Sequence, residues 1–171
     1  SPVTYCFEAE FGDVHRFYDR RGVAYELREE YAFRITPGFS VPDWAKGAVM
    51  YQIFTDRFCN GTVTNDVTTK EDFYIEAPVQ AVTDLHRPPQ SMEVGCFYGG
   101  DLVGVRKKLD YLQNLGVEVI YFNPLFVSPS NHKYDSQDYD YIDPHYGVIL
   151  RDEGECLAPG DNDNSHATKY I

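Results

Sequence analysis

The sequence predicts an α/β chain built around a βαβ unit, with a short antiparallel β-segment before it. Two observations carry this prediction. Nearly continuous apolar runs at residues 48–54 and 117–122 are typical of buried parallel strands. Between them, residues 101–115 carry leucine and valine at helical spacing. A strand, a helix and a second strand joined by a tight glycine turn form a parallel pair.

Residues 1–36 follow a different pattern, in which apolar and polar residues alternate around turn signals. Val3, Tyr5 and Phe7 alternate with polar neighbours, Gly12-Asp13 predicts a turn, and a second strand is expected over residues 14–18. Such a small set of strands is marginally stable alone, so it is expected to belong to a larger β-domain. Prolines and a glycine at 37–42 then predict a linker or domain edge, which places the domain division between residues 40 and 41.

The predicted helix has recognisable ends. Asp101 is a good N-cap, and Gly116 is a good residue for the position just beyond the C-terminus. The apolar stripe consists of Leu102, Val105, Leu109, Leu112 and Leu115. The second strand ends at Asn123-Pro124.

The last part of the chain, residues 148–171, has little periodicity and is rich in acidic and polar residues. It could be an ordered functional loop or a mobile tail. The composition favours mobility.

Charge and cysteine usage restrict the partners and the compartment. The chain has 27 acidic and 15 basic residues and a net charge of −12, which argues against nucleic acid or an anionic membrane as a partner. A neutral substrate or a cation is easier to accommodate. The four cysteines are widely spaced, and no signal peptide is visible at the first residues, so the cytoplasm is the expected compartment.

An ordered series of motifs carries a family resemblance. It runs through Tyr51–Phe58, Asn60-Gly61, Asn65-Asp66, Phe97–Leu102 and Leu109–Val117 to Ile120–Pro124, His132–Asp135 and Ile142–Pro144. This string resembles the opening of the catalytic barrel in the α-amylase family of glycoside hydrolases, in particular the neopullulanase, cyclomaltodextrinase and maltogenic amylase group. The resemblance implies that residues 41–171 form the first strands and helix of a (β/α)8 TIM barrel. Residues 1–40 would be the tail of an N-terminal β-sandwich domain and a linker.

The loop at residues 60–66 places oxygen-bearing side chains around a turn. By itself it reads as an Asn-Gly turn with polar neighbours. The resemblance implies a structural Ca²⁺ instead, since hard cations take six to eight oxygen ligands. The ligands carried over by position are Asn60, Asn65, Asp66, the carbonyl of Gly99, and Asp101. Thr62 departs from the family, which usually has Asp or Asn there, and this puts one ligand in doubt.

His132 and Tyr134 follow the second strand of the βαβ unit, on the side where β/α barrels bind substrates. Without the resemblance they would read as an ordinary surface histidine and a half-buried tyrosine. The resemblance implies that Tyr134 stacks on a sugar ring and that His132 hydrogen-bonds sugar hydroxyls. Asp56 and Arg57 are expected to form a structural ion pair rather than to take part in catalysis.

The family motifs that contain the catalytic carboxylates do not occur in these 171 residues. The expected function is therefore that of a part of a retaining glycosidase acting on α-glucosidic bonds of starch-derived oligosaccharides, cyclodextrins or pullulan. The chain alone is expected to be inactive, and the resemblance implies a homodimer for the complete enzyme. The alternative is a non-catalytic carbohydrate-binding or interaction module derived from such an enzyme.

Overall fold

The chain separates into two compact units in a computed structural model, which describes residues 1–170. The first unit is Ser1–Gly47, and the second begins at Ala48. The division predicted between residues 40 and 41 falls in the stretch just before this boundary. Ile171, the last residue of the predicted segments 41–171 and 148–171, lies outside the described residues.

The first unit contains the predicted hairpin. Strand β2 (Phe7–Phe11) pairs antiparallel with β3 (Val14–Asp19), and β4 (Gly22–Ala24) extends the sheet on the other side of β3. The turn between β2 and β3 is the predicted Gly12-Asp13, where Gly12 has a φ of +60° that favours glycine. A second pair joins β1 (Val3–Tyr5) to β5 (Phe33–Ile35). The alternation in the sequence therefore predicted this part correctly.

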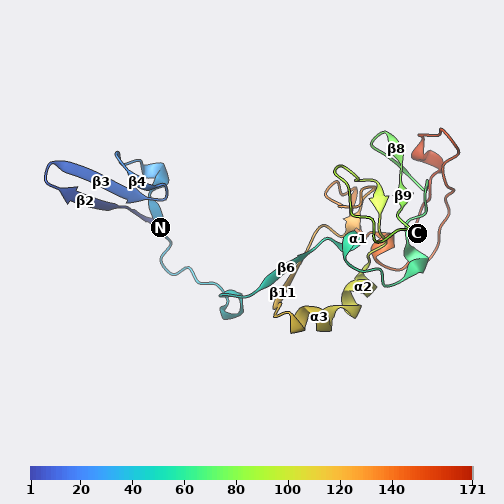
Figure 1. The fold of residues 1–171 in the computed structure, drawn as a ribbon, viewed down its shortest axis with the longest axis horizontal. Helices are drawn as coiled ribbons and strands as arrows, with labels where there is room; N and C mark the ends of the chain where they lie inside the picture. The colour runs from blue at the N-terminus through green and yellow to red at the C-terminus, as the bar shows by residue number, and fades with distance from the viewer. Residues whose placement is uncertain (171) are drawn as a thin grey trace. The chain divides into compact units, whose positions relative to one another are not determined.

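The second unit contains the predicted parallel pair. Strand β6 (Met50–Ile53) lies beside β11 (Val119–Phe122), with Ile53 opposite Phe122 (Figure 1). Ile53, Val105 and Leu112 are buried together and form the core between the strands and the helical segment. The βαβ prediction is confirmed.

The helix is divided where a continuous one was expected. It consists of α2 (Leu102–Lys107) and α3 (Leu109–Asn114), with Lys108 between them at φ −103° and ψ 7°. The Lys108 N–H donates to the Val105 carbonyl at 2.9 Å, three residues earlier, which is the hydrogen bond of a 3₁₀ turn rather than of an α-helix. The predicted stripe is only partly covered, and Leu109 and Leu115 are exposed.

The other elements of the chain are short. The remaining α-helix is α1 (Thr55–Phe58), and the remaining strands are β7 (Phe73–Tyr74), β8 (Ala77–Pro78), β9 (Gln80–Ala81), β10 (Cys96–Phe97), β12 (Phe126–Val127) and β13 (Asp138–Ile142). The 3₁₀ turns are η1 (Glu29–Tyr31), η2 (Asp43–Ala45), η3 (Val63–Asn65), η4 (Pro144–Tyr146) and η5 (Asn164–His166). Across residues 1–170, the helices are too short to span a bilayer.

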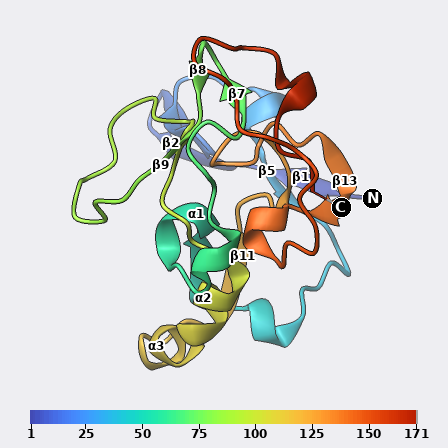
Figure 2. The same ribbon diagram turned by 90° about the vertical axis from the view of Figure 1, so that its right-hand side faces the viewer.

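Residues 148–170 run beside the β7–β8 hairpin (Figure 2). Asn164 exchanges two hydrogen bonds with the backbone of Phe73, at 2.8 and 2.9 Å. Farther along, the Leu157 N–H donates to the Lys70 carbonyl at 2.7 Å, and Leu157 and Ala167 are buried. These contacts give the segment a defined path, while the mobility expected for residues 148–171 stays a prediction.

Candidate functional site

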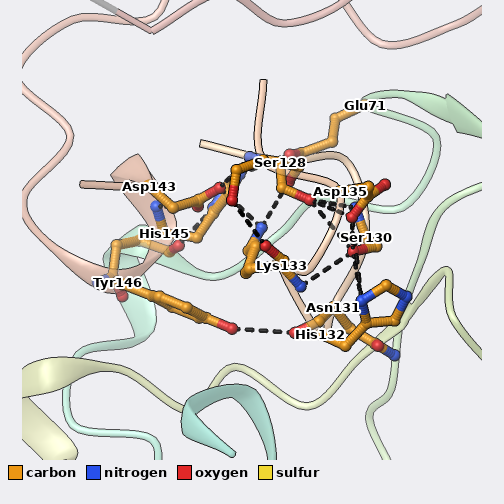
Figure 3. Close-up of polar contacts among 12 residues, drawn as sticks. Glu71, Ser128, Ser130, Asn131, His132, Lys133, Asp135, Asp143, His145 and Tyr146 are labelled. Atoms are coloured by element: carbon orange, nitrogen blue, oxygen red, sulfur yellow. Dashed lines mark hydrogen bonds and ion pairs between the residues drawn. The ribbon is translucent and has the colours of Figure 1, made fainter. Parts of the chain in front are cut away.

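The loop between β12 and β13 alternates buried and more exposed side chains over a few residues. Ser130, Asn131 and Lys133 are at most 2% exposed, whereas Tyr134 is 62% exposed. Lys133 has a φ of +61°, which turns the backbone between His132 and Tyr134. The loop therefore presents His132 and Tyr134 outward from a buried polar base. Figure 3 shows His132 at the edge of this base. Both of the residues predicted to bind substrate belong to this outward pair.

An ion pair lies at the centre of that base. The Lys133 ammonium is 2.7 Å from Asp143 Oδ2 and also donates to the Ser128 carbonyl at 2.7 Å. Its charge faces the rings of Phe97 and Tyr146, each with its centroid at 5.3 Å. The hairpin of β12 and β13 brings these residues together, because Ser128 directly follows β12 and Asp143 directly follows β13.

Asn131 joins the loop to a neighbouring segment. Its side-chain amide donates to the carbonyls of Glu93 and Cys96, at 2.6 and 2.8 Å. The backbone carbonyl of Asn131 accepts a hydrogen bond from the Tyr146 hydroxyl at 3.0 Å. Burial, together with the charges of Asp56 and Asp143, raises the pKa of Tyr146, so this hydroxyl keeps its proton and acts as the donor.

A cluster of hydroxyl and carboxylate groups lies next to His132. The Ser128 hydroxyl donates to Asp135 Oδ1 at 2.6 Å, and the Ser130 hydroxyl donates to the same oxygen. Burial opposes ionisation of Asp135, but the hydrogen bonds from Ser128, Ser130 and Tyr74 outweigh it and lower the pKa to about 2. Ser130 Oγ is also 3.2 Å from His132 Nδ1.

His132 and Tyr134 lie side by side at the outer edge of the loop. Their ring centroids are 5.9 Å apart, with 38° between the ring planes. An exposed aromatic face beside an imidazole can offer a flat apolar surface and a hydrogen-bonding group to the same ligand. This combination suits a polar ring with C–H patches, such as a sugar.

A second buried pair connects this region to the loop at residues 60–66. His145 Nε2 is 2.6 Å from Glu71 Oε1, and His145 Nδ1 is 2.7 Å from the Asn65 carbonyl. Burial alone would lower the pKa of His145, but the Glu71 carboxylate, helped by Asp143, raises it above its ordinary value. The Asn65 amide also donates to the Gly147 carbonyl at 2.8 Å. The two loops are therefore fastened to each other through η4.

Three of the candidate cation ligands come into direct proximity. The Asn60 amide donates to both oxygens of Asp66, at 2.7 and 2.9 Å. Gly99 has a φ of +78°, and a Cβ there would lie 2.6 Å from Asn60 Nδ2 and 2.7 Å from Asp66 Oδ1. A glycine is needed at this position because its backbone approaches the two side chains so closely.

The other two candidates each offer an unpartnered oxygen. Asp101 caps α2 by accepting from the Gly104 N–H through Oδ1, while its buried Oδ2 has no hydrogen-bond partner within residues 1–170. In the same part of the chain, the buried Oδ1 of Asn65 also lacks a partner. Burial raises the pKa of Asp66, the hydrogen bond from Asn60 opposes this, and the charge of Asp101 adds to the rise. The two carboxylates, one of which has a free oxygen, and the free amide oxygen of Asn65 fit a hard cation.

The predicted ion pair between Asp56 and Arg57 is confirmed, with 3.0 Å between Asp56 Oδ2 and Arg57 Nε. Asp56 Oδ1 accepts hydrogen bonds from the backbone N–H groups of Tyr98 and Gly99. Burial raises the pKa of Asp56 to about 6, although these hydrogen bonds and Arg57 work against it. Asp56 thereby joins α1 to the segment that carries Gly99.

A cavity of about 860 Å³ borders the buried base of the loop and is lined among others by Glu71, Lys133, Asp143, His145 and Tyr170. Neither His132 nor Tyr134 lines it. We place the candidate site at the exposed pair, since an aromatic ring can support a sugar only where its face is accessible.

Sequence reasoning missed the buried base of the site. Asp143 is the N-cap of the 3₁₀ turn η4, where its Oδ1 accepts from the His145 N–H at 3.1 Å. The ion pair with Lys133 and the roles of Ser128, Ser130, Asn131 and Asp135 were not predicted. The concentration of small polar residues on both sides of His132 was the available signal.

Comparison with known proteins identifies the family. Residues 52–152 match the family model of the α-amylase catalytic domain. The chain is 48% identical over 111 residues to neopullulanase 2 of Thermoactinomyces vulgaris, an alignment that covers 65% of this chain and 17% of that enzyme. It is 47% identical over 109 residues to the intracellular maltogenic amylase of Bacillus subtilis, covering 64% and 16%. The chain thus spans about a sixth of the length of these relatives.

Solved structures agree with this result. The chain is similar to the type III pullulan hydrolase of Thermococcus kodakarensis, with a TM-score of 0.55 and 32% identity over 86% of this chain and 26% of that one. It is also similar to the cyclic α-maltosyl-(1→6)-maltose hydrolase of Arthrobacter globiformis in complex with that sugar, with a TM-score of 0.53 and 33% identity over 65% and 22%. The parallel strands, the helical crossover and these matches show that the chain belongs to the α-amylase family and carries part of its catalytic domain.

Proposed function

We propose that the chain is part of a retaining glycoside hydrolase that acts on α-glucosidic bonds of starch-derived oligosaccharides, cyclodextrins or pullulan. The observation that carries the proposal is the pair of His132 and Tyr134, held outward by a buried polar base in a chain of the α-amylase family. Relatives named for pullulan and for a cyclic maltosyl sugar support this substrate class.

Tyr134 would support one face of a glucose ring, and His132 would bind a hydroxyl of the same ring. A retaining glycosidase needs a carboxylate nucleophile and a carboxylic acid about 5–5.5 Å apart. We place both groups outside these 171 residues. The contribution of this segment is to position the sugar, and orientation of the reacting ring can account for a large share of a catalysed rate.

The test is the replacement of Tyr134 by Ala in the full-length enzyme. We expect kcat/KM on maltoheptaose to fall by about 10- to 100-fold, with kcat affected as well as KM, because the ring must be held in the transition state. Tyr111→Ala is a matched control, since Tyr111 is 58% exposed but lies on α3. Equal kinetics for the Tyr134 variant, the Tyr111 variant and the wild type would refute the proposal.

We also propose a structural Ca²⁺ held by Asn60, Asn65, Asp66, the Gly99 carbonyl and Asp101. Its support is the pair of neighbouring carboxylates and the unpartnered oxygens of Asn65 and Asp101. When bound, such an ion would neutralise the repulsion between Asp66 and Asp101. A homodimer of the full-length enzyme and a cytoplasmic location stay predictions.

A further inference from the structure

The hairpin of the first unit carries three metal-binding side chains on one of its faces. Glu8 and Glu10 are two residues apart on β2, so their side chains leave the sheet on the same side. His15 on β3 lies directly opposite Glu10 and therefore shares that face (Figure 1). The rings of Phe7 and Phe11 alternate with the glutamates and belong to the other face. The polar face of the hairpin thus combines two carboxylates with an imidazole.

The three side chains converge on one point. His15 Nδ1 is 3.1 Å from Glu8 Oε1 and 3.7 Å from Glu10 Oε1. One ligand atom from each residue lies within 4.8 Å of those of the other two. Donor atoms that share a tetrahedral Zn²⁺ at about 2.0–2.2 Å are themselves about 3.3–3.6 Å apart. The two distances from Nδ1 bracket this range, so small side-chain rotations would let the three groups share one ion.

The two carboxylates have no permanent cation beside them within residues 1–170. Their ion-pair partner there is the His15 ring, which is charged only when it is protonated. The adjacent cation, Arg16, belongs to the opposite face by strand alternation, and its guanidinium lies over the Tyr25 ring at 4.3 Å. A neutral imidazole between two glutamates leaves two negative charges and a nitrogen lone pair, which a divalent cation can satisfy together.

The ligand set favours a transition metal over Ca²⁺ or Mg²⁺. Calcium and magnesium take oxygen ligands, whereas an imidazole nitrogen suits Zn²⁺ and its neighbours in the first row. The side chains of His15, Glu8 and Glu10 are 52%, 47% and 67% exposed, so an ion can reach them from solvent. Three protein ligands would leave the fourth tetrahedral position to water.

We propose that Glu8, Glu10 and His15 form a Zn²⁺ site that cross-links β2 to β3. Among the described strands, β2 lies at the edge of a sheet in the order β2-β3-β4. A sheet of this size is marginally stable alone, and an ion that binds only the paired strands stabilises their pairing. The site is separate from the loop proposed for Ca²⁺ and does not depend on the proposed function.

The test combines equilibrium dialysis of the full-length enzyme against micromolar ZnCl₂ with hydrogen exchange of peptides that cover residues 7–19. His15→Ala should bind one Zn²⁺ fewer per chain than the wild type, and Glu10→Gln should raise Kd by about tenfold or more. With free Zn²⁺ at about ten times Kd, exchange of the β2–β3 amides should slow by about tenfold. In His15→Ala it should not respond to Zn²⁺.

One variant separates ligation from simple attraction of Zn²⁺ to a negative surface. Glu10→His removes a charge but keeps a ligand, so it should retain both the bound Zn²⁺ and the slowed exchange. His86→Ala is the matched histidine control, because His86 is exposed and forms no ion pair within the described part of the chain. Asp66→Asn controls for Zn²⁺ in the loop proposed for Ca²⁺. Both controls should keep the Zn²⁺-dependent slowing of exchange over residues 7–19.

Equal Zn²⁺ binding by the wild type and His15→Ala would overturn the inference. It would also fail if exchange over residues 7–19 in the wild type did not respond to Zn²⁺, or if Glu10→His lost Zn²⁺ as Glu10→Gln does. None of these outcomes depends on the kinetics of the Tyr134 variant.

Discussion

Removal of the Lys133 ammonium tests whether the buried ion pair holds the site together. In Lys133→Met the apolar stem remains between Phe97 and Tyr146, but Asp143 keeps a buried carboxylate without its cation. Breaking a buried pair in this way costs about 3–5 kcal/mol of folding free energy. Asp143 still accepts hydrogen bonds from the backbone N–H groups of Ser128 and His145, so we expect the lower end, about 3 kcal/mol.

For a chain of this length, that loss corresponds to a fall in Tm of about 6 to 12 °C, which differential scanning calorimetry can measure. The control is Lys46→Met. Lys46 lies 2.6 Å from Asp43, but their side chains are 57% and 95% exposed, compared with 1% and 3% for Lys133 and Asp143. An exposed pair contributes about 0–1 kcal/mol, so Tm should hardly change in the control.

The double variant Lys133→Met with Asp143→Asn removes the buried charge as well as its partner. Its Tm should therefore lie above that of Lys133→Met alone. If Lys133→Met loses no more stability than Lys46→Met, the buried pair does not stabilise the loop and the reasoning is wrong.

Three further predictions concern the metal, the pH and the isolated chain. In a sample that holds Ca²⁺ at about 100 times its Kd, removal of the ion by a chelator should lower Tm by about 5 to 10 °C. The Asp66→Asn variant should show no such difference between the Ca²⁺-loaded and the chelated sample. A wild-type Tm that does not respond to Ca²⁺ would contradict the proposed site. The folded-state pKa of Asp135 is about 2, below its ordinary value, so its stabilising contribution is present above about pH 4 and is lost as the pH falls toward 2. Acid denaturation of Asp135→Asn should lack this component, and identical pH profiles would argue against it. The 171-residue chain alone should release no reducing ends from maltoheptaose or a cyclodextrin, because two carboxyl groups must be held across the bond in distinct environments; turnover abolished by mutating a carboxylate within the chain would show that the active site lies here.

Local patterns in the sequence were sufficient for the regular elements. The β2–β3 hairpin follows from period-two alternation on either side of Gly12-Asp13, and the β6–β11 pair follows from two apolar runs joined by a helical stripe. The position of His132 and Tyr134 beyond a parallel strand could also be predicted, because the order of strand and loop along the chain determines it. The ion pair of Asp56 and Arg57 joins neighbours in sequence, so it too was accessible.

Only the tertiary structure decided which polar residues are buried. Lysine is ordinarily among the most exposed residues, so nothing local indicates that Lys133 is 1% exposed. Its partner Asp143 reaches it because β12 and β13 pair and close the intervening loop. The division of the helix at Lys108 also depends on the fold, since the expected caps and stripe were both present. Long-range pairing supplies the partners that make burial of a charge tolerable, and a local pattern does not contain that information.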